Sequence, residues 1–203
     1  MGEYPDAINQ FTRVDAMALT TFSAPARYLN GIMYYNNKDF PEAVRWFKEA
    51  QADSRFSDLC DFYLVDSEFN MKNYDYVVSE GVRIFDSVPQ ERRERLARII
   101  SESYLVKGEN DLARQYFESS HMTDMTRSDL FYAGSVLYAV EDYEGAIESF
   151  SRMPQRIDSL GQIANYQLGN AYVRTRNKVA AMEAFRDASN VTHDPEITED
   201  ALF

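Results

Sequence analysis

Apolar residues recur along the chain at steps of three and four residues. In the segment 40–50 they occupy Phe40, Ala43, Val44, Phe47 and Ala50. Such steps place side chains on one face of an α-helix. The pattern therefore predicts amphipathic helices, each of which buries its apolar face against a neighbouring helix.

One motif returns at regular intervals, a small residue followed four positions later by an aromatic residue. Its copies are Ala7 and Phe11, Ala43 and Phe47, Ala113 and Phe117, Ala146 and Phe150, Ala181 and Phe185, with a degraded copy at Val77 and Gly81. The first members, at positions 7, 43, 77, 113, 146 and 181, are separated by 36, 34, 36, 33 and 35 residues. A period near 34 residues is typical of helix–turn–helix repeats.

A second set of positions lies upstream of most copies. Small residues precede the partner alanine by 12 residues (43 − 31, 113 − 101, 146 − 134, 181 − 169) at Gly31, Ser101, Gly134 and Gly169. Polar stretches separate the two sets at 36–39, 107–110 and 141–142. Each unit of sequence thus predicts two antiparallel helices that approach closely at the small residues and are joined by a polar turn.

Two segments carry a family resemblance. Residues 168–172 (Leu-Gly-Asn-Ala-Tyr) and 141–147 (Glu-Asp-Tyr-Glu-Gly-Ala-Ile) resemble the two helix signatures of tetratricopeptide repeat (TPR) proteins. The resemblance covers essentially the whole chain. It implies an all-α fold, a right-handed α-solenoid of antiparallel helix pairs with a concave inner groove.

The repeat register predicts one solenoid domain over residues 1–203. Residues 1–23 are expected to be the second helix of a truncated repeat, and 197–203 the start of a further helix. Between them we expect five repeats, at 24–57, 58–93, 94–126, 127–161 and 162–196. Since both ends fall within a repeat, the sequence is expected to be a piece of a longer array. Apolar residues at the two ends would allow end-to-end self-association, namely Ile8, Phe11, Leu202 and Phe203.

The repeat at 58–93 departs from the pattern at three positions. Val65 replaces the small residue, Glu68 replaces an aromatic residue, and Gly81 replaces the phenylalanine. We expect this helix pair to pack more loosely or at a shifted angle.

Charge and composition narrow the function classes. The formal net charge is 21 − 33 = −12, which disfavours binding to nucleic acids and to anionic membranes. No apolar run approaches the roughly 18 residues of a membrane span, so membrane insertion is not expected. Cys60, His121 and His193 are too few for a disulfide framework or a Cys/His zinc site.

Motifs of catalysis are not found in the sequence. It has no phosphate-binding glycine loop and no nucleophile motif. We expect a chain that is not an enzyme and that holds no cofactor and no metal ion. Cys60 is expected to be a buried, unreactive thiol because acidic neighbours raise a thiol pKa.

The resemblance implies that residues of each first helix line the groove and bind a protein or peptide. The candidate peptide-binding residues are Tyr28, Tyr35, Phe62, Phe69, Arg95, Arg98, Phe131, Tyr138, Tyr166 and Asn170. Aromatic residues and arginine dominate interface energetics because they desolvate a large, rigid area. The alternative is that the rings only pack between neighbouring helices.

Arg95 and Arg98 are three residues apart and share a helix face. They could clamp a carboxylate of the partner, since arginine binds carboxylates in a bidentate manner. The alternative is a solvated helix start, balanced by Glu91, Glu94 and Glu102.

Two functions remain open at this stage. The first is an interaction scaffold that binds a polypeptide segment in the groove. The second is a structural spacer in a larger envelope or assembly protein, which burial of Tyr28, Phe62, Phe131 and Tyr166 would favour. The composition slightly favours a bacterial periplasmic or cell-envelope protein, and a single cysteine fits the cytoplasm equally well.

Overall fold

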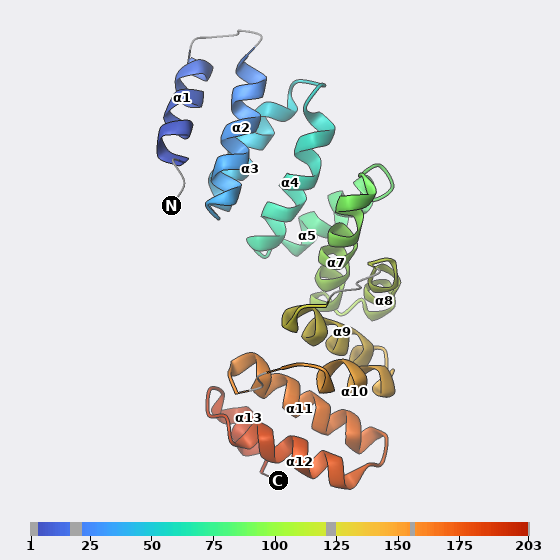
Figure 1. Ribbon diagram of the computed structural model, residues 1–203. Coiled ribbons are helices and arrows are strands. Elements are labelled where there is room, and N and C mark those ends of the chain that lie inside the picture. The colour runs from blue at the N-terminus through green and yellow to red at the C-terminus, as the bar shows by residue number, and fades with distance from the viewer. Residues whose placement is uncertain (1–3, 17–21, 121–124, 155–156, 203) are drawn as a thin grey trace. The chain divides into compact units, whose positions relative to one another are not determined.

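The computed structural model describes residues 4–16, 22–120, 125–154 and 157–202 (Figure 1). Within these ranges the chain forms helices joined by turns, and no β-strand occurs. This confirms the expected all-α class. Internal contacts divide the chain into two compact units, Met1–Lys107 and Gly108–Phe203, and each unit is described by itself.

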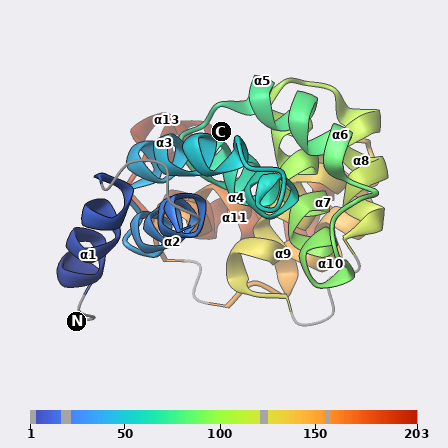
Figure 2. The same cartoon turned by 90° about the horizontal axis from the view of Figure 1, so that it is seen from above.

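The first unit consists of helical segments that follow one another in the sequence. They are α1 (Tyr4–Ala16), α2 (Ser23–Asn36), α3 (Phe40–Gln51), α4 (Ser57–Asn70), α5 (Tyr74–Tyr76), the π-helical η1 (Val77–Gly81), α6 (Val82–Ile84) and α7 (Gln90–Val106). Helices α2 and α3 form a hairpin, and α4 lies between α3 and α7 in both views (Figures 1 and 2). The segment α5–η1–α6 returns along α4 as the second half of the next hairpin.

The second unit contains two long hairpins. Its helices are α8 (Asn110–Ser119), α9 (Arg127–Ala139), α10 (Tyr143–Ser151), α11 (Ser159–Arg174), α12 (Lys178–Ser189) and α13 (Pro195–Asp200). Helix α9 pairs with α10, and α11 pairs with α12. Among the helices of the described residues, none combines the length and the apolar character needed to cross a bilayer.

Three hairpins are closed by a glycine that lies under a phenylalanine ring. A Cβ atom built on Gly31 would lie 2.6 Å from the ring of Phe47. The same distance, 2.6 Å, separates such an atom on Gly134 from Phe150, and one on Gly169 from Phe185. No side chain fits at these glycines, so the close approach of the two helices depends on them. This is the role expected of the repeated small residues.

The α4–η1 hairpin closes differently. A Cβ atom built on Gly81 would lie 3.3 Å from Cγ1 of Val65 and 3.0 Å from Cγ1 of Ile100. The space that a phenylalanine would occupy is therefore filled by Val65 from α4 and by Ile100 from α7, both buried. The second helix also takes a π-helical turn over Val77–Gly81. The looser or angled packing of this helix pair stays a prediction.

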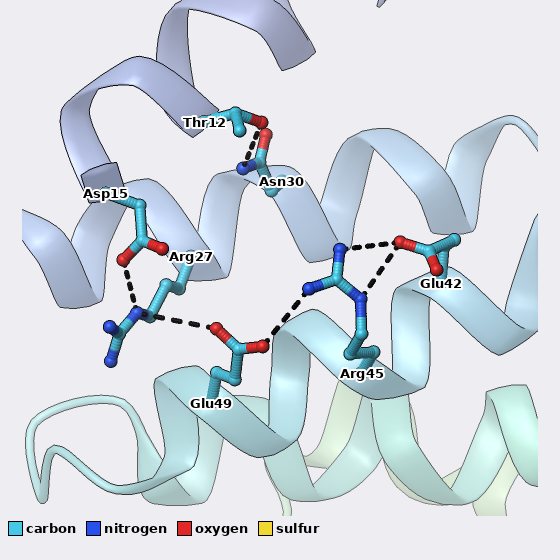
Figure 3. A network of polar contacts seen from close by, with 7 residues as sticks. All are labelled: Thr12, Asp15, Arg27, Asn30, Glu42, Arg45 and Glu49. Atoms are coloured by element: carbon cyan, nitrogen blue, oxygen red, sulfur yellow. Dashed lines mark hydrogen bonds and ion pairs between the residues drawn. The ribbon is translucent and has the colours of Figure 1, made fainter.

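Helix α1 attaches to α2 through polar side chains (Figure 3). Asn30 of α2 is fully buried and donates to the hydroxyl of Thr12 over 3.4 Å, and Arg27 donates to Asp15 over 2.5 Å. At the position equivalent to Asn30, helix α4 carries Leu64, which packs in the apolar core between α3 and α4. A buried position that is polar in the contact between α1 and α2 is therefore apolar in the contact between α3 and α4.

Candidate functional site

The expected peptide-binding residues all fall on first helices, and the structure groups them by unit. Tyr28 and Tyr35 lie on α2, Phe62 and Phe69 on α4, and Arg95 and Arg98 on α7 of the first unit. Phe131 and Tyr138 lie on α9, and Tyr166 and Asn170 on α11 of the second unit. The face of each unit is therefore described separately.

Three rings stand at equivalent positions on their helices and pack in the same way. The ring centroid of Tyr28 lies 6.0 Å from that of Phe47. Phe131 lies 6.2 Å from Phe150, and Tyr166 lies 5.8 Å from Phe185. Tyr28, Phe131 and Tyr166 are half-buried. Each ring thus supports its own hairpin and is partly exposed to solvent. Tyr28 also packs between helices, since its centroid lies 5.5 Å from that of Phe56 and 6.3 Å from that of Tyr63.

Phe62, at the same position of α4, differs from these rings. Its side chain is only 6% exposed. The guanidinium carbon of Arg92 lies 5.2 Å above its ring, and the ring of Tyr63 lies 5.6 Å away. Phe62 is therefore a buried side chain and does not offer an exposed ring to a ligand.

Rings near the ends of the first helices pack on the aromatic residue that opens the second helical segment. Tyr35 lies 5.9 Å from Phe40, and Tyr138 lies 5.5 Å from Tyr143. Phe69 pairs with Tyr74 in the same manner, over 6.2 Å. These rings are half-buried, as is Asn170 on α11.

A buried carboxylate joins three helices of the first unit. Asp66 on α4 is 0% exposed. It accepts a hydrogen bond from the hydroxyl of Tyr35 over 2.7 Å, and from Nε and Nη2 of Arg95 over 2.6 and 2.7 Å. Asn70 also donates to it, over 3.1 Å. A buried charge needs such partners, and here they tie α2, α4 and α7 together.

The carboxylate also affects the protonation of its neighbours. Hydrogen bonds to Asp66 raise the pKa of Arg95, because they favour the charged guanidinium. Burial, and then the negative charge of Asp66, raise the pKa of Tyr35. Both side chains therefore remain protonated donors at neutral pH, and the network stays intact there.

These contacts bear on the expected clamp for a partner's carboxylate. Arg95 already holds a carboxylate of its own chain, and Nη2 of Arg98 lies 3.9 Å from Glu102. The Arg95 side chain is still 44% exposed, so only its outward edge faces solvent. The repeat register placed Asp66 on the groove face, and the sequence interpretation missed that it is buried and binds Arg95. The available signal was a charge between Val65 and Ser67.

A cleft of about 520 Å³ lies between the start of α4 and the start of α7. Its lining combines apolar residues (Leu59, Phe62, Ile84, Val88 and Pro89) with charged and polar ones (Asp58, Asp61, Ser87, Glu91 and Arg92). One wall exists because α7 begins at Gln90, four residues before the expected repeat boundary at 94. The sequence interpretation missed this cleft, although Pro89 directly before the helix is a recognised start signal.

The thiol and imidazole groups offer little chemistry. Burial, with a smaller contribution from Asp61, raises the pKa of Cys60 to about 12. The protonated thiol is a poor nucleophile. His193 is exposed, and His121 lies outside the described residues. Across the part of the chain that the structure describes, no group of three or more His, Cys, Asp or Glu side chains is arranged to hold a metal ion.

Comparison with known proteins gives one result for the family. The family model described as tetratricopeptide repeat matches residues 1–58. No curated protein sequence matches the chain significantly. The matched segment covers α1–α3, and the Gly31–Phe47 closure found there returns in the α9–α10 and α11–α12 hairpins. Over residues 1–58 the chain is thus similar to tetratricopeptide repeat proteins.

Proposed function

We propose that this chain is a non-enzymatic interaction module that binds a segment of a partner protein on the exposed face of its first helices. Tetratricopeptide repeats generally mediate protein–protein interaction. The observation that carries the proposal is the recurrence of a half-buried, partly exposed ring at one position of three first helices, at Tyr28, Phe131 and Tyr166.

The packing of these rings supports a role as anchors. Each ring is held on one side by the phenylalanine of its own hairpin. A side chain that is already immobilised loses little conformational entropy when a partner covers its exposed part. In the first unit, the bonds of Asp66 to Tyr35 and Arg95 fix α2, α4 and α7 relative to one another. A preorganised face of this kind favours binding.

The charge of the chain bears on the partner. A net charge of −12 favours partners with basic segments and opposes nucleic acids. Self-association through the chain ends is a further proposal of the same kind. It rests on Ile8 and Phe11 of α1 and on Leu202, which is 70% exposed, whereas Phe203 lies outside the described residues.

A spacer in a larger assembly protein is the second candidate. It is favoured by the burial of Phe62, by the partial burial of Tyr28, Phe131 and Tyr166, and by the carboxylates that already bind Arg95 and Arg98. In a spacer, the half-buried rings would contribute only to the stability of their hairpins.

Selection of short random peptides displayed on phage, with the whole chain as bait, distinguishes the two candidates. If the module binds partners, Tyr28→Ala or Phe131→Ala lowers its affinity for the selected peptides by about tenfold or more. The matched control is Met182→Ala, an exposed apolar side chain on the second helix α12. Circular dichroism of each variant checks that the helices persist. Selected peptides whose affinity is equal in all variants would refute binding at the rings of Tyr28 and Phe131 and favour the spacer.

A further inference from the structure

We infer that the cleft between α4 and α7 binds a basic–apolar motif, in which an apolar side chain of a partner peptide enters the cleft and an adjacent lysine or arginine binds the acidic rim. This inference rests on the proposed function and gives it a chemical preference. The cleft belongs entirely to the first unit.

The floor of the cleft is apolar and buried. Phe62, Ile84 and Val88 are buried side chains that form its floor. Leu59 is 42% exposed at the start of α4, where it adds apolar surface that the folded chain leaves uncovered. A volume of about 520 Å³ is within the range of binding pockets. It accommodates one apolar side chain together with the methylene stem of a neighbouring lysine or arginine.

The rim carries uncompensated negative charge. The lining contains three carboxylates and one guanidinium. Asp61 is already engaged, since it accepts from Arg83 over 3.0 Å. Asp58 and Glu91 form no ion pair with any described residue, and both face the cleft. The helix dipole favours a carboxylate in the first turn of each helix, which accounts for an acidic residue at both positions. The dipole does not account for the fact that both carboxylates line the same cleft.

The single guanidinium on the rim does not favour an acidic ligand. The carbon of the Arg92 guanidinium lies 5.2 Å from the ring of Phe62 and 4.9 Å from that of Tyr63. Its Nη2 donates to the hydroxyl of Tyr63 over 3.4 Å. Arg92 is thus held against aromatic rings, whereas the carboxylates of Asp58 and Glu91 are available. Charge complementarity therefore selects a cationic residue beside the apolar one.

The inference is tested by nuclear magnetic resonance titration of the isotope-labelled whole chain, which detects weak binding. The probe is a blocked heptapeptide with a central leucine flanked by lysines in a glycine–serine background. We expect saturable shifts at the amides of the cleft, weakened by added salt because the rim contact is electrostatic. Replacing the leucine of the probe by serine lowers the affinity by about tenfold or more. Replacing both lysines by glutamate has at least as large an effect.

Variants of the chain assign the binding to the cleft. The double variant Asp58→Asn, Glu91→Gln is expected to lower the affinity for the lysine probe by roughly fivefold or more. Leu59→Ala is expected to lower it by about threefold. The matched control, Glu144→Gln with Glu183→Gln, removes two exposed carboxylates of the second unit and leaves the affinity unchanged. Equal binding of the lysine and glutamate probes, shifts that map away from the cleft, or no saturable shift would each overturn the inference.

Failure of the inference and failure of the proposed function give different results. If the cleft has no such preference, the rim variants do not change the probe affinity, while the selected peptides still respond to Tyr28→Ala. If the chain is a spacer, neither the selected peptides nor the lysine probe responds to any of these variants.

Discussion

The two hairpins of the first unit place the small and the large residue of their helix contact on opposite helices. In the α2–α3 hairpin, the first helix supplies the glycine and the second supplies the ring, Gly31 under Phe47. In the α4–η1 hairpin, the first helix supplies the larger side chain and the second supplies the glycine, Val65 against Gly81. The exchange preserves contact between the helices, but the remaining space is filled by Ile100 from α7.

The second arrangement places carboxylates in the interior, whereas the buried polar side chains of α2, Ser23 and Asn30, are uncharged. Asp66 and Glu68 of α4 are buried, and Asp66 binds Tyr35 of α2 and Arg95 of α7. The α2–α3 hairpin is closed by a glycine–ring contact between its own two helices, and Phe47 also stacks on Tyr63 of α4 over 5.2 Å. In the α4–η1 hairpin the corresponding space is filled from α7. Substitutions in the two hairpins should therefore differ in size and in which partners they affect. Fluorescence of Trp46, the single tryptophan, reports the unfolding of this unit.

The largest effects are expected at the Gly31–Phe47 pair, and the first test is Gly31→Val. The new Cβ would lie 2.6 Å from a ring that is fully buried, so the helices must separate. Overpacking of this kind lowers the free energy of unfolding by about 3 kcal/mol. Urea denaturation followed by Trp46 fluorescence measures the loss.

A double variant tests whether the clash is specific. Phe47→Ala removes the ring and alone costs about 3–5 kcal/mol through the cavity that it leaves. Combined with Gly31→Val, the total loss should be smaller than the sum of the single losses by about 1–2 kcal/mol. Strict additivity would show that Gly31 and Phe47 do not act as a pair.

Arg95→Ala is expected to have the next largest effect. It removes two of the hydrogen bonds that hold the buried Asp66. Loss of one partner of a buried ion pair costs about 3–5 kcal/mol. The exposed part of Arg95 lets water reach the carboxylate, so we expect about 2 kcal/mol in urea denaturation.

The control for this variant comes from the first hairpin. Arg45→Ala breaks surface contacts to Glu42 and Glu49, and exposed pairs are worth about 0–1 kcal/mol. If Arg95→Ala were no more destabilising than Arg45→Ala, the network around Asp66 would not be what holds the second hairpin.

The sequence predicted the α2–α3 hairpin more fully than the α4–η1 hairpin. Gly31, Phe47 and the polar turn between them are local signals that recur along the chain. Val65 and Gly81 were each recognised as departures, but that they compensate each other is a tertiary contact across two helices. Ile100 belongs to yet another helix, so no local pattern connects it to Gly81.

The candidate site shows the same limit. The repeat register predicted which residues lie on first helices, including Tyr28 and Arg95. It did not predict that Arg95 binds Asp66, since this pairing depends on how α4 and α7 pack. It also did not predict that Arg92 and Tyr63 cover Phe62 while Tyr28 stays partly exposed. The same position has different neighbours in each hairpin.

Cys60 of α4 provides a pH-dependent test of the second hairpin. Burial raises its pKa from 9.0 to about 12 in the folded chain. Its contribution to stability is therefore complete below pH 9 and is lost as the pH rises from about 9 to about 12, because only the unfolded thiol ionises in that window. Between neutral pH and about pH 10, the free energy of unfolding of the wild-type chain should therefore fall by about 1 kcal/mol more than that of Cys60→Ala, measured by urea denaturation.

Thiol reactivity gives an independent measurement on the same residue. The folded chain should react with an aromatic disulfide reagent much more slowly than the urea-unfolded chain at neutral pH. Arg95→Ala should accelerate the reaction because it loosens the helix that carries Cys60. Rapid labelling of the folded wild-type chain would contradict the buried position of the thiol.

The smallest effect is expected for Gly81→Ala, which adds a single methyl group at the inverted contact. The new Cβ would lie 3.0 Å from a side-chain atom of Ile100 and 3.3 Å from one of Val65, so modest side-chain shifts can accommodate it. Alanine also favours a helical backbone over glycine by about 1 kcal/mol, which offsets the crowding. The net change in the free energy of unfolding should stay within about 1 kcal/mol, measured in urea beside Gly31→Ala. Both substitutions gain the same helix preference of alanine over glycine. A larger loss of unfolding free energy at Gly31 than at Gly81 therefore measures the difference in packing between the two hairpins. Equal losses at Gly31 and Gly81 would mean that the exchange of large and small residues does not relieve the crowding at the second contact.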